Sequence, residues 1–396
     1  MTASHRRPLA TRTALAALAA LTLLADSQQL GAQSRFEILR DPDDGAIDLS
    51  QWLATAGGFL PILSPVTEPA VGYGAAAVLA FFHRPAGWDI EEARRRFEAG
   101  ERLTIPSVSA ALGMYTSSDS WIAGGGHLGV WGEGRWRYTG GAGFTRLDLE
   151  VAGNGPDGST RLFGYRLDGW GLTQSLRYRL GSSDFLVGAL YTYLDTETVF
   201  FDDALPGVAP QFDNALASAG ISFAYDSRNA TFTTDRGLFV NLEGRRYDEA
   251  FGGDFDYWSV KTTILAYLDQ IPDIVLGLRA EGGSVGAGAP FWAKPAINLR
   301  GVARGRYSGD RSLTLESELR WDISRRWSLV GFGGGGWNDA ASGTEDEVRV
   351  VAGGGGGVRY LLARAFGIRG GLDFAYGEDG FAFYVTVGSA CLLYTS

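Results

Sequence analysis

The sequence contains little of what metal sites, disulfide frameworks and nucleic-acid-binding surfaces require. It has one cysteine, Cys391, and three histidines, His5, His83 and His127, in 396 residues. One cysteine excludes a disulfide framework and a cysteine-rich zinc site, and histidines so far apart in sequence argue against a histidine metal cluster. Acidic residues outnumber basic ones, 45 to 35, and no basic arm is present. We therefore expect no metal, no cofactor and no nucleic-acid partner.

Long hydrophobic runs are also missing after the first residues, so no segment reaches the ~18 apolar residues of a membrane helix. At the N-terminus, Arg6, Arg7 and Arg12 precede an apolar run from Ala14 to Ala25. Small residues follow, with cleavage expected after Ala32 or Ser27. We interpret residues 1–32 as a secretory signal peptide, with an amphipathic membrane anchor as the alternative.

What the chain has in abundance is alternation with a period of two residues, in segments rich in glycine. In segment 312–324, Leu313, Leu315 and Leu319 share one face, whereas Glu316 and Glu318 share the other. Segments 237–249, 254–270 and 274–286 alternate in the same way. The predicted strands are long and have aromatic residues near their ends, as expected for the interfacial girdles of a membrane barrel. These residues are Trp121, Trp131, Trp136, Trp258, Trp327 and Trp337. A soluble β-sandwich is the alternative, because it also alternates.

We predict an all-β fold, a transmembrane antiparallel β-barrel of sixteen strands, because bacterial single-chain barrels have even strand numbers. Fifteen strands can be read between residues 70 and 390, and a short one around 57–66 completes the set. Segment 160–180 is about twice the length of a tilted span, and its alternation flips at Gly169–Gly171. We expect a bulge there, with an extracellular extension. Residues 88–101 predict a short amphipathic helix.

Three segments carry a resemblance to a known family: 225–237 (YDSRNATFTTDRG), 298–321 (NLRGVARGRYSGDRSLTLESELRW) and 348–390. Together they resemble the bacterial surface antigen family, the BamA/TamA-type outer-membrane barrels. The opening segment 58–74 is similar to short members that consist of the barrel alone. The resemblance covers about residues 57–390.

The resemblance implies a sixteen-stranded barrel whose sixth extracellular loop, here about 287–311, folds back into the lumen. The tip of that loop would be Arg300-Gly301. A guanidinium in a water-poor lumen needs a carboxylate, and Glu316 and Glu318 are the candidate partners. A solvated loop arginine is the alternative. The chain departs from the family pattern at Gly334, where an inward aspartate is usual, and at Val302, where an aromatic residue is usual.

Other charged side chains are expected to line the lumen. They carry both signs, so no ion selectivity can be inferred from them. They are Glu243, Arg245, Lys261, Arg279, Glu281 and Arg320. The two glycine runs, Gly333–Gly336 and Gly353–Gly357, are expected on neighbouring strands, where they leave room for the loop backbone.

The functional expectation is an integral protein of the outer membrane of a Gram-negative-type bacterium that assists insertion or transport of proteins or lipids. Its expected partners are outer-membrane lipids, the barrel-assembly machinery for its own insertion, and protein substrates. A passive or gated pore is the first alternative, and a barrel enzyme (a lipase or protease) is the second. We expect no enzymatic activity, because His83 and His127 lack a catalytic signature and are expected to be structural or lumen-lining.

The expected organisation is a signal peptide (1–32), a short periplasmic segment (33–56), the barrel (57–390) and a non-native tail (391–396). The segment 33–56 is too short for the periplasmic POTRA domains of family members that insert or translocate proteins. Within it, Asp48 is expected to cap a short helix, in preference to a calcium loop at 41–48. The tail breaks the alternation of the last strand and matches a translated sequencing adaptor, so the native chain is expected to end in Phe or Trp near position 391.

Overall fold

The computed structural model describes residues 38–54, 59–66, 71–83, 87–99, 101, 106–154, 160–201, 211–303, 305–339 and 349–388. The predicted signal peptide and the predicted tail lie outside these residues. The chain divides into two units, Met1–Ile47 and Asp48–Ser396. In the first unit, residues 40–47 form a turn closed by a bridge between Arg40 and Ile47.

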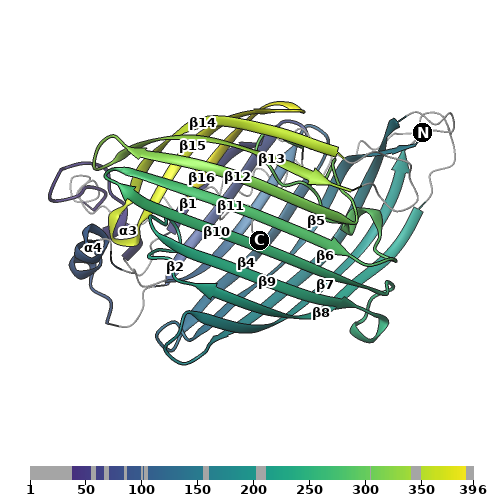
Figure 1. The fold of residues 1–396 in the computed structure, drawn as a ribbon, viewed down its shortest axis with the longest axis horizontal. Coiled ribbons are helices and arrows are strands. Elements are labelled where there is room, and N and C mark those ends of the chain that lie inside the picture. The colour runs from purple at the N-terminus through teal and green to yellow at the C-terminus, as the bar shows by residue number, and fades with distance from the viewer. Residues whose placement is uncertain are drawn as a thin grey trace, which may run out of the picture. The chain divides into compact units, whose positions relative to one another are not determined.

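The second unit is one antiparallel sheet of sixteen strands in sequence order, which confirms the predicted fold class. The sheet curls into a nearly closed barrel with strongly tilted strands (Figure 1). The strands are β1 (Phe59–Val66), β2 (Gly74–His83), β3 (Ser107–Thr116), β4 (Trp121–Trp131), β5 (Trp136–Asn154), β6 (Thr160–Arg179), β7 (Phe185–Phe201), β8 (Gln211–Asp226), β9 (Gly237–Tyr247), β10 (Tyr257–Ile271), β11 (Ile274–Val285), β12 (Arg311–Asp322), β13 (Trp327–Asn338), β14 (Arg349–Ala363), β15 (Ile368–Gly377) and β16 (Gly380–Val387).

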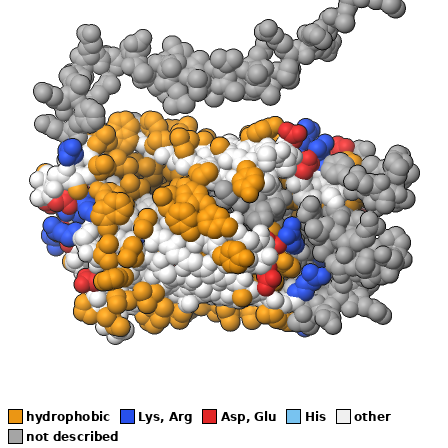
Figure 2. Space-filling model, turned by 90° about the horizontal axis from the view of Figure 1, so that it is seen from above, with side chains coloured by type: hydrophobic (Ala, Val, Ile, Leu, Met, Phe, Trp, Pro, Cys, Tyr) orange, Lys and Arg blue, Asp and Glu red, His pale blue; other side chains and the backbone are white. Residues whose placement is uncertain are grey.

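Alternation along each strand separates an apolar outer face from a polar inner face. On β12, Leu313 and Leu315 are 42% and 52% exposed, whereas Thr314 and Glu316 are 2% and 6% exposed. Figure 2 shows hydrophobic side chains over the middle of the barrel wall and charged side chains gathered at its two ends. Hydrophobic side chains on the outside and charged groups within reverse the arrangement of a soluble sandwich.

Strands β5 and β6 extend beyond the band of hydrophobic side chains on the outer wall. They lack the predicted bulge, since the β5–β6 register is continuous over the whole length of both strands. The alternation flips where the wall leaves the apolar band. Beyond Trp170, the outward side chains Arg166 and Asp148 form an ion pair with Nε–Oδ1 at 2.6 Å. The inward side chain Leu167 is buried. A change of surroundings from apolar to aqueous therefore explains the flip.

Two short helices, α3 (Ser50–Ala54) and α4 (Ile90–Glu98), lie at the same end of the barrel, which we call the helix end (Figure 1). The opposite end, which carries the connection 286–310 between β11 and β12, is called the loop end. The other helical segments are single 3-10 turns: η1 (Glu249–Phe251), η2 (Phe291–Ala293) and η3 (Arg364–Phe366). No described helix is long and apolar enough to cross a membrane.

Candidate functional site

The connection 286–310 folds into the lumen instead of projecting from the loop end. Its two arms are joined by a bridge between Ala296 and Ser308, and the N–H of Ile297 donates to the carbonyl of Tyr307 at 2.9 Å. The side chains of Ile297, Leu299 and Val302 are at most 2% exposed and pack with Val351 on the barrel wall. Apolar packing thus holds the loop against β14.

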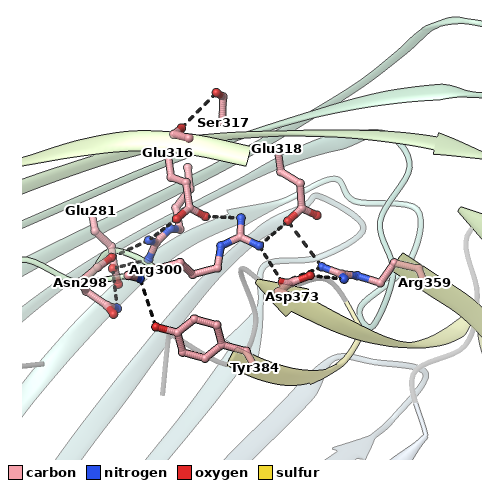
Figure 3. Close-up of polar contacts among 12 residues, drawn as sticks. Glu281, Asn298, Arg300, Glu316, Ser317, Glu318, Arg359, Asp373 and Tyr384 are labelled. Atoms are coloured by element: carbon pink, nitrogen blue, oxygen red, sulfur yellow. Dashed lines mark hydrogen bonds and ion pairs between the residues drawn. The ribbon is translucent and has the colours of Figure 1, made fainter. Parts of the chain in front are cut away.

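Arg300, at the tip of this loop, is surrounded by three carboxylates (Figure 3). Its Nη2 lies 2.7 Å from Glu316 Oε1, and its Nη1 lies 2.8 Å from Glu318 Oε2 and 2.9 Å from Asp373 Oδ2. The guanidinium carbon also lies 3.4 Å from the centre of the Phe332 ring. The structure therefore brings Arg300 against both glutamates named from the sequence.

Asp373 and Arg359 belong to the same cluster but were not found from the sequence. Asp373 is fully buried, and its Oδ2 lies 3.0 Å from Arg359 Nη2. It comes from β15, so a later strand supplies the inward aspartate that Gly334 cannot. The parity of residue 373 on its strand was readable in the sequence, but its distance from Arg300 depends on how deeply the loop enters the lumen.

Gly301 follows Arg300 in a left-handed backbone conformation, with φ of +87°. A Cβ there would lie 2.9 Å from the backbone of Gly377, and the N–H of Gly301 donates to the Tyr384 hydroxyl at 3.1 Å. Only glycine combines this conformation with so close an approach to β15. The Arg-Gly pair is thus a steric requirement as well as an electrostatic one.

The glycine runs make the wall thin where the loop lies. The two runs are paired on β13 and β14, as predicted. A Cβ at Gly353 would lie 2.5 Å from the carbonyl oxygen of Arg300, and one at Gly336 would collide with the side chain of Ile297. The missing side chains let the loop backbone approach the sheet directly.

A second set of charges extends the network beneath the loop. Arg279 Nη1 lies 2.9 Å from Glu281 Oε2, and Arg279 Nη2 donates to the carbonyl of Asn298 at 2.6 Å. Lys261 Nζ lies 3.7 Å from Glu281, and Arg279 lies 3.7 Å from Glu316. Arg279, Glu281 and Lys261 therefore line the lumen as a group continuous with the Arg300 cluster.

The remaining predicted lumen charges lie apart from Arg300. Arg245 pairs with Glu243 at 3.2 Å. Arg320 pairs with Asp235 and with Asp322, the latter at 3.1 Å. Asp235 belongs to the connection between β8 and β9, so this connection reaches across the lumen to β12 near the helix end.

The residue Asp48, just before α3, is bonded to the β12–β13 connection and to η3, which follows β14. The buried Asp48 lies 2.7 Å from Arg326 Nη1 and accepts from the N–H groups of Ser50 and Arg364, at 2.7 and 3.2 Å. Burial would raise the pKa of Asp48, but these hydrogen bonds from Ser50, Arg326 and Arg364 together hold it below its ordinary value. The predicted capping role is close to what is seen, since Asp48 bonds the first N–H of α3 from two residues before it.

An apolar cluster at the helix end joins the first and last parts of the barrel. It includes Leu53 of α3, Leu60 of β1, Phe82 of β2, Ala93 of α4 and Phe366 of η3. Because these residues come from both sides of the edge between β1 and β16, we call the cluster together with the Asp48 contacts the helix-end clamp.

The edge between β1 and β16 is the seam of the barrel. The two strands lie next to each other, but no ladder pairs them among the described residues. Pro61 and Pro65 of β1 carry no N–H, so neither can donate across the seam. An apolar groove of about 340 Å³ spans the seam and extends over β15 to β14, with Leu63 of β1 and Val385 of β16 among its lining residues.

His83 and His127 were expected to be structural or lumen-lining, and the structure places both on the outer face of the barrel. His83 has the parity of Phe81, which is 40% exposed on the outer face. Register then places His127 on the same face, because Phe81 pairs with Ser109 and Ser109 pairs with His127. The two histidines, far apart in sequence, meet at Ser109.

The sequence matches no protein-family model and no curated protein. Solved structures resemble it in fold. CdiB from Escherichia coli has a TM-score of 0.55 and 12% identity, over 89% of this chain and 73% of that one. BamA from Haemophilus ducreyi lacking POTRA domains 1-3 has a TM-score of 0.53 and 14% identity, over 83% of this chain and 70% of that one. CdiB from Acinetobacter baumannii has a TM-score of 0.51 and 10% identity, over 83% of this chain and 59% of that one.

The fold is that of an outer-membrane β-barrel. At 10–14% identity the likeness extends to the fold alone.

Proposed function

We propose that this barrel resides in the outer membrane of a Gram-negative-type bacterium and assists insertion or transport of proteins or lipids there through its seam. The observation that carries the proposal is the combination of a β1–β16 seam without a ladder among the described residues and a lumen that the Arg300 loop enters. With the Arg300 loop inside the lumen, the seam is the route by which a client would reach the lipid. The sequence resemblance to BamA/TamA-type barrels supports the same proposal.

The proposed orientation places the helix end in the periplasm and the loop end outside the cell. In this orientation β1 begins on the periplasmic side and β16 ends there, as an even number of strands requires. Outer-membrane lipids, the barrel-assembly machinery that inserts the protein, and client proteins are the partners in this proposal.

A gated pore is the second candidate. It is favoured by the connection between β8 and β9, which crosses the lumen near the helix end. Arg320 on β12 pairs with Asp235 of this connection, so displacing the connection and the Arg300 loop together would open a water path. We do not propose an enzymatic role for the lumen, since its charges neutralise one another instead of leaving a base beside a nucleophile.

Cross-linking the seam tests the proposal. Cys391, the single cysteine, is replaced by serine, and cysteines are placed at Leu63 and Val385, which line the same groove. The matched control pairs Leu63 with Ala77, its neighbour in the β1–β2 ladder. Each pair is joined with a short bismaleimide in vesicles, and the folding rate of a small client barrel is followed by its gel mobility.

We expect the unmodified protein to accelerate client folding, the seam cross-link to abolish the acceleration, and the control cross-link to leave it intact. Equal acceleration with a locked seam would contradict a role for the seam. Absence of acceleration in every sample, together with ion conduction, would favour the gated pore.

A further inference from the structure

Three polar side chains form a hydrogen-bonded group on the apolar outer face of the barrel near the helix end. His83 Nε2 lies 2.8 Å from Ser109 Oγ, and His127 Nδ1 lies 2.9 Å from the same oxygen. The three residues come from neighbouring strands β2, β3 and β4, and their registers place them on one face. The serine hydroxyl is thus held between two imidazole rings.

Aromatic side chains enclose this group because two glycines make room for them. The Trp131 ring lies over Gly129 and the Tyr138 ring over Gly140, where a Cβ would collide with each ring. The centres of both rings are 6.3 Å from that of His127. Tyr138 also donates to Gln174. The polar group therefore sits in a constructed aromatic frame and is not a scatter of single side chains.

The frame is at the level of an aromatic row that surrounds the helix end. Tryptophan and tyrosine collect at the depth of lipid headgroups, where their rings are in the apolar layer and their polar atoms reach water. The outward members of the row are Trp131, Trp136, Phe185, Trp321 and Trp327, each 43–55% exposed.

Polar groups on a lipid-facing wall are costly unless they find hydrogen-bond partners. Each imidazole has a second ring nitrogen, and no hydrogen bond from a described residue reaches His83 Nδ1 or His127 Nε2. The ring centres are 5.6 Å apart. The serine hydroxyl has one hydrogen and can donate to only one of the two rings. That ring accepts with one nitrogen and carries its own hydrogen on the other, and this N–H can donate to a phosphate oxygen over about 2.7–3.2 Å.

We propose that His83, Ser109 and His127 bind the phosphate group of a glycerophospholipid in the periplasmic leaflet. The proposal rests on the membrane placement proposed above, which puts the helix end at that leaflet. Binding fits the geometry better than ester hydrolysis, because no described carboxylate orients either imidazole. It also fits better than a metal site, because no group of three metal-ligating side chains occurs among the described residues.

Native mass spectrometry in a phosphorus-free detergent measures this binding directly. Dimyristoyl phosphatidylethanolamine is the probe, and dimyristoylglycerol, which has the same acyl chains without phosphate, is the matched ligand control. The variants are His83→Leu with His127→Leu, and Ser109→Ala. The matched protein control is Ser317→Ala, because Ser317 is another serine on the outer face of the barrel.

We expect one tightly held phospholipid per wild-type barrel, no such retention of the diacylglycerol, and about tenfold weaker retention in the double histidine variant. Ser109→Ala should weaken retention less, and Ser317→Ala should match the wild type. Equal retention by all proteins would overturn the proposal, and so would competition by inorganic phosphate at the same concentration as lipid, since the site would then recognise a free anion.

Folding is checked in the same samples by comparing gel mobility with and without boiling. A heat-modifiable barrel that retains no phospholipid overturns this site alone. A chain that never becomes heat-modifiable in detergent or vesicles contradicts the membrane barrel, and with it the proposed function.

Discussion

A guanidinium is stable in a water-poor lumen only when carboxylates surround it, and Arg300 meets this requirement with Glu316, Glu318 and Asp373. Arg300 is thus paired with three carboxylates of the barrel wall, and a second ion pair, between Arg306 and Asp379, also holds the loop. Removing the Arg300 side chain leaves these three carboxylates with only Arg359 and Arg279 nearby, so part of their buried negative charge loses its partner.

Arg300→Ala is expected to destabilise the barrel by about 3–5 kcal/mol, because breaking a buried ion pair leaves uncompensated charges. The denaturant midpoint in detergent measures this, and proteolysis of residues 286–310 measures release of the loop. Arg246→Ala is the control, since Arg246 is 46% exposed beside Asp248 and exposed pairs are worth about 0–1 kcal/mol. Similar midpoints for the two variants would contradict the anchoring role.

The pH dependence of the free energy of unfolding should show how much the Asp48 carboxylate stabilises the fold. Its pKa in the folded protein is lowered, so its contribution to stability is complete above the unfolded value of 3.8 and is lost as pH falls through the folded pKa. Asp48→Asn is therefore expected to be less stable than the wild type at pH 7, and the difference should shrink below pH 4. Denaturant midpoints across pH 3–7 test this, and a constant difference would refute it.

At the scale of elements, β13 and β14 show that glycines can give a strand the space that an inserted loop needs. Glycine in a strand normally weakens it, because the backbone gains freedom and the face loses packing. Here the paired glycine runs accept the Arg300 loop, so the packing lost between side chains is replaced by contact between backbone and sheet.

Gly353→Ala should displace the loop, because the new Cβ would meet the Arg300 carbonyl oxygen at 2.5 Å. Gly333→Ala is the matched control in the paired run, where the nearest atom would be 3.8 Å away. We expect faster proteolysis of the loop in Gly353→Ala only. Equal cleavage rates would show that the close approach does not constrain the loop.

At the scale of the whole molecule, the lumen is occupied from both ends. The Arg300 loop enters from the loop end, and the turn containing Asp235 enters from the helix end. The seam, in turn, is bridged at the helix end by the helix-end clamp. The barrel thus combines a lumen that two segments enter with a β1–β16 seam that has no ladder among the described residues.

Planar bilayers provide the test at this scale. The wild type is expected to conduct poorly because of its filled lumen, and Arg300→Ala combined with Asp235→Ala should raise single-channel conductance by releasing both insertions. Circular dichroism of the same samples should retain a β-sheet spectrum. A large conductance in the wild type would contradict a filled lumen.

The sequence by itself determined the strands, their number and their two faces. Period-two alternation is a local property, because successive side chains on a strand point to opposite faces whatever the strand packs against. The same parity placed Arg279, Glu316, Glu318 and the other lumen charges on the inner face. At Gly169–Gly171 the alternation of apolar and polar residues changes phase, and the sequence suggested a bulge. The structure shows that the outer face passes there from apolar to aqueous surroundings, with no bulge.

Only the tertiary structure decided which of those residues meet. Asp373 joins Arg300, and His83 joins His127 through Ser109, because sheet register and the depth of the loop place residues far apart in sequence side by side. His83 shares its parity with Phe81, so its outward direction was readable, but its lateral neighbours were not. Distances across a lumen and along a sheet depend on curvature and register, which arise from the barrel as a whole and leave no local pattern in the chain.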